Sequence, residues 1–434
     1  MKKREQCILS PEEIPYYWYN VKADLPFTLD PILHPGTNQP AKPEDLKPIF
    51  PDGLIEQEFT LQREVPIPEA IRDEYAVYRP SPLVHATRLE EYLDTPAKIY
   101  FKDESVSPCG SHKVNTALAQ AYFNKREGIE KLVTETGAGQ WGSALAYAGK
   151  KFGLTVEVYM VRVSYLTKPA RQQMMHLFGA EVYPSPSERT EHGRAVLETD
   201  PNCNGSLGMA ITDAVEVTVK SKNAKYSLGS VLDHVLLHQT VIGQEVKKQL
   251  KKMNVKPDIL VACVGGGSNF GGFVLPFIPD RLKDPHLEII ASEPEACPSL
   301  MKGEFRYDFG DTGHLTPLLK MCTLGSDFLP PPIHAGGLRY HGASPIVSRL
   351  VAEKYVRPDD LAQDEILQAA QIFSLTEGII PAPESAHAIA TVIKEAKKCK
   401  ANREPKTIVF NLSGHGHLDL ASYDFIAKIN GNSK

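Results

Sequence analysis

The chain has 434 residues, of which 42% are hydrophobic and 23% charged, and its net charge is -5. At about 150 residues per domain this length predicts two to three domains, and the composition excludes a disordered chain, a collagen and a disulfide-rich miniprotein. The excess of acidic side chains gives no positive field for a phosphate backbone, so we expect no nucleic-acid partner.

The seven cysteines are an odd number and lie far apart in the sequence. This argues against a disulfide framework or a Cys-x-x-Cys metal site and favours a reducing compartment. The opening MKKREQCILS lacks the apolar stretch of a signal peptide. No uncharged apolar run approaches the roughly 18 residues of a membrane span, so we expect a cytoplasmic protein without a membrane partner.

Residues 11–51 are rich in proline and aromatic residues and show no periodic pattern, so we expect an extended arm that packs over the body. Further on, short β-branched runs alternate with longer amphipathic ones, which predicts an α/β fold with mostly parallel sheets. The expected strands read KIYFKDE, KLVTETGAG, TVEVYMV, DILVACV, HLEIIAS and TIVFNLS. The expected helices cover residues 113–124, 141–152, 169–178, 233–252 and 383–400.

In open parallel sheets the ligand lies beyond the carboxyl ends of the strands, so the loops that follow strands should carry the chemistry. The strand ILVACV leads into Gly265, Gly266, Gly267, Ser268 and Asn269. Consecutive NH groups in such a loop can hold a phosphate, although a tight turn with packing glycines is an equal alternative. The loop lacks the Lys-Ser/Thr of a P-loop and therefore does not imply a nucleotide.

Lys113 stands in CGSHKVN, at the expected start of a helix. The positive helix N-terminus disfavours an ammonium group there, which lowers the lysine pKa and favours an amine nucleophile. Taken alone, Lys113 could equally be a surface lysine and His112 a structural hydrogen bonder.

Two further loops and one histidine pair complete the candidates. ETGAGQWG offers NH groups and the Thr136 hydroxyl for a small carboxylate, with Glu135 at its base as a proton carrier. Ser413, after the last strand, can pair with a ring nitrogen without carrying charge. Either loop could instead be a well-made turn. His234 and His238 lie one turn apart but lack the glutamate of a His-Glu-x-x-His site, so we expect no metal.

Together with EGIIPAPESAHA and NLSGHGH, these motifs resemble the tryptophan synthase beta chain family in order and spacing, from about residue 79 to residue 417. The resemblance implies a fold-type II enzyme that uses pyridoxal phosphate (PLP), with two α/β domains and the cofactor between them. We expect an arm at 1–80, a domain at 95–240 that carries the Schiff-base lysine, and a domain at 241–434, with part of 50–94, that carries the phosphate cup.

The resemblance also assigns roles. It makes Lys113 the Schiff-base lysine, Glu135 the acid/base, Ser413 the partner of the pyridine nitrogen and Glu377 the glutamate behind the cofactor ring. A neutral Ser413 favours β-elimination and replacement over transamination. The phosphate would be held by Gly265, Gly266, Gly267, Ser268 and Asn269, with His112 beside them. The substrate carboxylate would be held by Thr136, Gly137, Ala138, Gly139, Gln140 and Trp141.

The implied reaction joins L-serine and indole to give L-tryptophan, the last step of tryptophan biosynthesis. The family also implies a homodimer and, as a second cofactor, a monovalent cation. A serine or threonine deaminase, or another β-eliminase, is the alternative among enzymes. A cofactor-binding regulator without activity is a further class, which the intact Lys113, Glu135 and Ser413 disfavour.

Departures from the family pattern indicate its second, diverged branch. Trp141 replaces a histidine, His415 and His417 replace an arginine and an aspartate, and Arg339 replaces an aspartate that contacts the serine hydroxyl. Because arginine suits a phosphate dianion, O-phosphoserine is an alternative donor with Arg339 as its ligand. Residues 185–194 lack the pattern that faces the alpha chain in the main branch, which leaves that partnership open.

Overall fold

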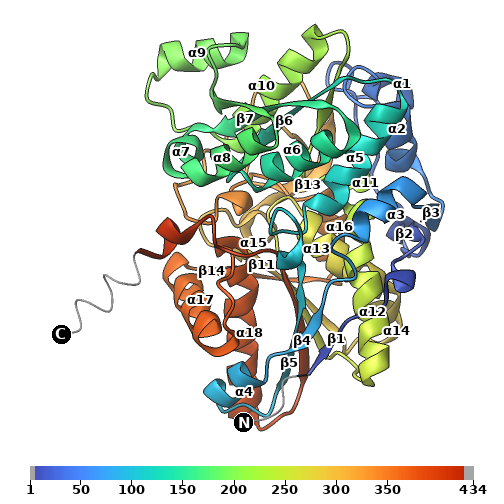
Figure 1. Cartoon of the computed structure of the whole chain (residues 1–434), viewed down its shortest axis with the longest axis vertical. Coiled ribbons are helices and arrows are strands. Elements are labelled where there is room, and N and C mark those ends of the chain that lie inside the picture. The colour runs from blue at the N-terminus through green and yellow to red at the C-terminus, as the bar shows by residue number, and fades with distance from the viewer. Residues whose placement is uncertain (1–4, 425–434) are drawn as a thin grey trace.

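The computed structural model describes residues 5–424 and contains two sheets that position the site (Figure 1). The large sheet has seven strands in the order β1-β4-β5-β15-β10-β11-β14, and the small sheet has four in the order β8-β7-β6-β9. The large-sheet strands are β1 (Gln6–Cys7), β4 (Leu83–His85), β5 (Lys98–Asp103), β10 (Ile259–Cys263), β11 (Glu288–Pro294), β14 (Arg357–Leu361) and β15 (Thr407–Leu412). The small-sheet strands are β6 (Lys131–Thr136), β7 (Thr155–Val161), β8 (Glu181–Ser185) and β9 (Ala224–Ser227).

Both sheets are mostly parallel, as the alternation of strands and helices predicts. The four pairings from β5 to β14 run parallel, and only the β1-β4 and β4-β5 pairings of this sheet, among the described residues, are antiparallel. All three pairings of the small sheet are parallel. Every residue of β10 is buried, which explains its continuous apolar sequence, because a central parallel strand is covered on both faces.

The expected boundary at residue 95 is wrong for β5. This strand was assigned to the domain at 95–240, but it pairs with β15 over six residues and with β4, both in the large sheet. The small sheet starts only with β6. The pattern of β5 shows that it is a strand, whereas its partner β15 lies some 300 residues further on, and sequence periodicity says nothing about such a pairing.

The helices that the sequence predicts are present, with one difference. The stretch 233–252 forms two helices, α11 (Asp233–Gln239) and α12 (Val241–Met253), with Thr240 between them. The hydroxyl of Thr240 donates to Leu237 O and accepts from Tyr19 N. None of the described helices has the length and apolar character needed to cross a membrane. The remaining helices are α1 (Pro43–Leu46), α2 (Asp52–Phe59), α3 (Glu69–Tyr75), α4 (Thr87–Leu93), α5 (Val114–Arg126), α6 (Gln140–Phe152), α7 (Arg162–Thr167), α8 (Pro169–Leu177), α9 (Glu191–Thr199), α10 (Leu207–Lys220), α13 (Ser268–Val274), α14 (Ile278–Lys283), α15 (Ser299–Lys302), α16 (Pro345–Ala352), α17 (Gln363–Glu377) and α18 (Pro383–Asn402).

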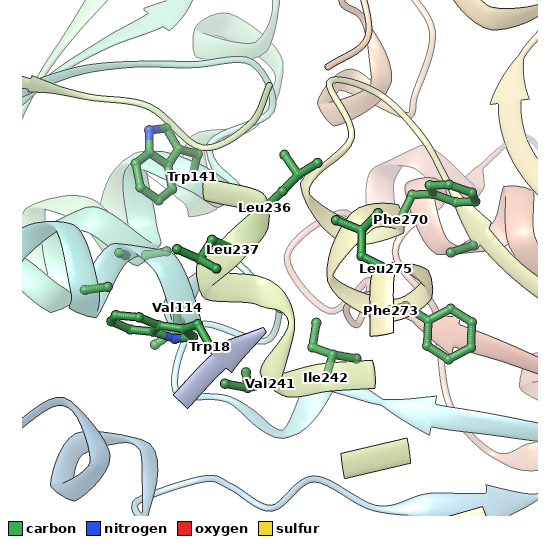
Figure 2. Close-up of a cluster of buried hydrophobic side chains, with 14 of the residues drawn as sticks. Trp18, Val114, Trp141, Leu236, Leu237, Val241, Ile242, Phe270, Phe273 and Leu275 are labelled. Atoms are coloured by element: carbon green, nitrogen blue, oxygen red, sulfur yellow. The ribbon is translucent and has the colours of Figure 1, made fainter. Parts of the chain in front are cut away.

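The N-terminal arm is part of the core. Two short strands, β2 (Tyr17–Tyr19) and β3 (Glu64–Pro66), pair within it, and α2 and α3 make it less extended than we expect from its prolines. Trp18 is fully buried, with its ring centroid 4.5 Å from that of His238. Figure 2 shows Trp18 in one cluster with residues of α11 and α12. A second short pair, β12 (Glu304–Phe309) and β13 (Leu318–Thr323), completes the strands.

Candidate active site

One cavity gathers loops from the carboxyl ends of strands in both sheets. From the small sheet come the residues that follow β6, and from the large sheet the residues that follow β10 and β15. The start of α5 and the 3-10 turn η5 (Gly336–Leu338) close it. The cavity is lined by His112, Lys113, Glu135, Thr136, Gly137, Ala138, Gln140, Trp141, Leu207, Gly229, Ser230, Cys263, Gly265, Gly266, Gly267, Ser268, Asn269, Gly336, Gly337, Leu338, Tyr340, Glu384 and Ser413.

Lys113 lies immediately before α5 and faces this cavity. Burial lowers its pKa, and the carboxylates of Glu384 and Glu135 oppose that change. The sequence argument relied on the helix N-terminus, whereas the structure shows burial as the cause. A lowered pKa raises the fraction of neutral amine, which is the nucleophilic form.

Glu135 occupies the end of β6 and is almost completely buried. Burial raises its pKa to about 7, against the opposing effects of the Tyr226 hydroxyl and Lys113. The Tyr226 hydroxyl donates to Glu135 Oε2 at 2.5 Å. A carboxyl group that titrates near neutral pH can both give and take a proton at the working pH of an enzyme.

The loop between β6 and α6 is held in a fixed shape. Gly139 has a left-handed backbone (φ 96°), and a Cβ atom there would lie 2.6 Å from Arg171 Cβ. Gly142 N donates to Thr136 Oγ1 at 3.1 Å, and Trp141 Nε1 donates to Thr134 Oγ1 at 2.7 Å. Gly139 thus shapes the turn and does not line the cavity, unlike the other five residues expected to hold a carboxylate.

The glycine loop after β10 lies against tightly packed neighbours. A Cβ atom on Gly266 would lie 2.3 Å from Ser230 Oγ, and Gly267 has a φ of 119°. Asn269 Nδ2 donates to Cys263 O, and Asn269 Oδ1 accepts from Asn411. The Asn269 side chain therefore braces the loop, which leaves backbone groups to face the cavity.

His112 connects this loop with the end of β15. Its Nε2 lies 3.3 Å from Ser268 Oγ, and its Nδ1 lies 3.3 Å from the carbonyl oxygen of Ser413. Burial lowers the pKa of His112 to about 3, so the ring is neutral at pH 7. The Ser413 hydroxyl lies 2.7 Å from Ser385 Oγ and, like its partner, carries no charge.

The structure contradicts the site assignment of Glu377. This residue ends α17, and its Oε1 accepts from Leu89 N at 2.9 Å, outside the cavity. Glu384, in the first turn of α18, lines the cavity instead. Its carboxylate accepts from Gly337 N at 2.8 Å and from Gln140 Nε2 at 3.0 Å. Both glutamates belong to EGIIPAPESAHA, and the turn at Gly378 directs them to different places.

Arg339 is likewise not in the cavity, although Leu338 and Tyr340 on either side of it are. Its Nη2 donates to Pro330 O at 3.3 Å, and its buried Nε has no partner among the described residues. The side chain points away because successive residues after η5 face opposite ways. The observation that favoured O-phosphoserine therefore no longer supports it.

Several residues of the site carry no sequence signal of their own. Tyr226, Gly229, Ser230 and Ser385 reach the site through the register of β9 and α18, which a single sequence does not show. Glu384 could have been found, because it lies in a motif that the sequence analysis singled out.

The two histidines of HVLLH have protein partners. His234 Nδ1 is bonded to Glu58, and His238 is bonded to Gln57 and Thr116. The described residues include no group of three or more side chains that could hold a metal ion.

A second, apolar cavity adjoins the first. Tyr340 lines both cavities, and Tyr226, which donates to Glu135, lines the second. The second cavity is lined by Ile32, Leu46, Ile49, Phe50, Ile211, Tyr226, Leu228, Val231, Leu232, Gly310, Thr316, Pro317, Leu319 and Tyr340.

Comparison with known proteins identifies the family. The model of the pyridoxal-phosphate dependent enzymes matches residues 75–414. The tryptophan synthase beta chain 2 of Thermotoga maritima is 64% identical over 96% of this chain and 98% of its own length. The chain belongs to the tryptophan synthase beta chain family. The beta chain 2 of Methanosarcina mazei is 56% identical over 97% of this chain and 96% of its own.

Solved structures agree on the fold. A fungal L-serine ammonia-lyase from Rhizomucor miehei superposes with a TM-score of 0.58 at 18% identity, covering 80% of this chain and 97% of that one. A threonine deaminase, whose source is abbreviated T.th., superposes with a TM-score of 0.54 at 20% identity, covering 81% of this chain and 98% of that one. Family membership and these likenesses confirm the expected fold-type II architecture and the PLP dependence of the family.

The residues of this beta-chain family member fit the cofactor. PLP needs an amine, a cradle for its phosphate and a partner for its ring nitrogen. The cavity offers the Lys113 amine, the closely packed glycine loop at 265–267, and the Ser413 hydroxyl at the end of a third segment.

Proposed function

We propose that this protein makes L-tryptophan by replacing the β-hydroxyl of L-serine with indole. The observation that carries the proposal is the meeting of an amine, a carboxyl group that titrates near pH 7 and an apolar cavity in one place. The names of the relatives support the same reaction.

PLP bound at Lys113 supplies an electron sink for the carbon that loses its α-proton. In our proposal the NH groups of the loop at 265–269 hold the phosphate, with His112 between Ser268 and Ser413. Ser413 accepts or donates at the ring nitrogen without adding charge. Glu384 holds Gln140 and the backbone of Gly337, and so fixes two walls of the cavity.

The protein groups then move protons at two atoms of the donor. The Lys113 amine takes the proton from the α-carbon, and Glu135 gives a proton to the departing β-hydroxyl. The NH groups and hydroxyl of residues 136–141 hold the donor carboxylate.

The second cavity supports an aromatic co-substrate. It is lined mostly by apolar side chains and adjoins the cavity that holds Glu135. We infer that indole binds there, since an apolar bicyclic ring gains from burial and a deaminase needs no such space.

We infer that serine is the donor, and not O-phosphoserine. Glu135 and Glu384 are the acidic groups that line the cavity, and Arg339 points elsewhere. Two carboxylates near the site would repel a phosphate dianion, and Lys113 is the cavity's one Lys or Arg side chain among the described residues.

A product assay tests the proposal. The PLP-loaded protein is given serine or O-phosphoserine, each with and without indole, and tryptophan, pyruvate and ammonia are measured. We expect tryptophan from serine plus indole. Pyruvate and ammonia with no tryptophan would establish a deaminase instead. The expected homodimer has the family resemblance as its support, and sedimentation of the purified protein would test it.

A further inference from the structure

The strand register places a tyrosine hydroxyl on the carboxyl group of Glu135. β6 and β9 are parallel neighbours in which Val133 lies opposite Tyr226. Val133 and Glu135 are two residues apart and so share one face of the sheet, which Tyr226 shares too. The Tyr226 hydroxyl reaches Glu135 Oε2 at 2.5 Å, and both side chains are buried.

The other nearby hydroxyl is directed elsewhere. Thr134 Oγ1 lies 3.4 Å from Glu135 Oε2, but it donates its single proton to the carbonyl oxygen of Ser227 in a short contact. Trp141 Nε1 donates to the same Thr134 oxygen and fixes its orientation. Among the described residues, Tyr226 is therefore the side chain that donates to this carboxylate.

We propose that Tyr226 is a positioning residue, which holds the Glu135 carboxyl group in the orientation for proton transfer and separates it from the apolar cavity. This inference rests on the proposed function of Glu135. The phenol ring forms part of the apolar wall, while its hydroxyl marks the polar end of that wall. One side chain thus fixes both the proton carrier and the near boundary of the aromatic site.

The titratable groups around Glu135 define what the loss of this hydroxyl does. Lys113 faces it from the start of α5, Tyr226 from β9 and Tyr340 from the residues after η5. The Tyr226 hydrogen bond and Lys113 lower the Glu135 pKa, while burial raises it. A hydrogen bond to a charged group contributes an amount equal to about 1 to 2 pH units, so removing it moves the Glu135 pKa upward by that amount.

The experiment compares Tyr226→Phe with Tyr340→Phe in the PLP-loaded protein. Tyr340 lines both cavities and donates its hydroxyl to Gly310 O at 2.9 Å, so its change removes a hydroxyl from the same surroundings but not from Glu135. Two readouts are taken. One is the pH profile of kcat for tryptophan formation, and the other is infrared titration of the carboxyl band that Glu135→Gln removes.

We expect both midpoints to move up by about 1 to 2 pH units in Tyr226→Phe and to stay in place in Tyr340→Phe. kcat should fall more than KM changes, because the group affected moves a proton. Coincident midpoints in the two variants would overturn the positioning role. If the wild type made no tryptophan while the infrared shift persisted, the proposed function would fail and the contact would stand.

Discussion

Exchange of the two glutamates of EGIIPAPESAHA tests the site most directly. Glu384→Ala removes the acceptor of Gly337 N and Gln140 Nε2, whereas Glu377→Ala removes the acceptor of Leu89 N alone. At about 1.5–3 kcal/mol for each hydrogen bond to a charged group, two bonds give roughly 3–6 kcal/mol as an upper bound for Glu384. We expect about 2–4 kcal/mol for Glu384 after water enters the space, and about 1–3 kcal/mol for Glu377.

The two variants differ in their effect on the cofactor. Because Glu384 is the first of the charges that raise the Lys113 pKa, its loss lowers that pKa further, and it also frees two walls of the cavity. We expect PLP affinity to fall about tenfold or more in Glu384→Ala, equal to about 1.4 kcal/mol, and to be unchanged in Glu377→Ala.

The assays are denaturant unfolding of the apoprotein and titration with PLP followed by absorbance. Glu377→Ala is the matched control, because it removes a buried carboxylate from the same motif outside the cavity. The reasoning would be refuted by wild-type PLP affinity in Glu384→Ala together with a tenfold loss in Glu377→Ala.

Three further predictions follow from named contacts. Borohydride treatment of the PLP-loaded protein should leave the cofactor attached to Lys113, as mass spectrometry of the peptides can show, and Lys113→Ala should retain no such label; a label on another lysine would contradict this. Gly266→Val should weaken PLP retention more than tenfold because its side chain would meet Ser230 and Val231, while the exposed control Lys251→Ala should retain PLP normally on a desalting column, and equal retention would point to another phosphate site. Arg339→Met should leave the ratio of kcat/KM for serine and O-phosphoserine within about twofold and the free energy of unfolding equal or higher by about 1–2 kcal/mol, since it replaces a buried charge without a carboxylate partner in residues 5–424, and a tenfold swing toward serine would restore the phosphoserine idea.

The parts of this protein that the sequence predicts are those that local patterns determine. The strand at 259–263 is apolar throughout because it is buried on both faces, and the glycines at 265–267 follow it because close neighbours exclude side chains. Lys113 and Glu135 stand next to such turns, so their places in the cavity could be expected from motif position.

The parts that sequence reasoning missed depend on contacts between distant segments. Glu377 and Glu384 are both plausible from the motif, and only the left-handed turn at Gly378 and the direction of α18 decide between them. Tyr226 needs the register of β9 against β6. Arg339 lies next to cavity residues in sequence, but its side chain leaves on the opposite side of the backbone.

The position of β15 in the large sheet affects how this protein is made. The strand comes last in the sequence, yet it lies between β5 and β10 in the middle of the sheet. During synthesis β5 therefore waits for about 300 residues before its partner emerges, roughly 15–60 s at about 5–20 residues per second. A ribosome that stalls before residue 407 releases a chain with two open strand edges, which are templates for aggregation. Nascent chains of this protein therefore depend on protection until translation is almost complete.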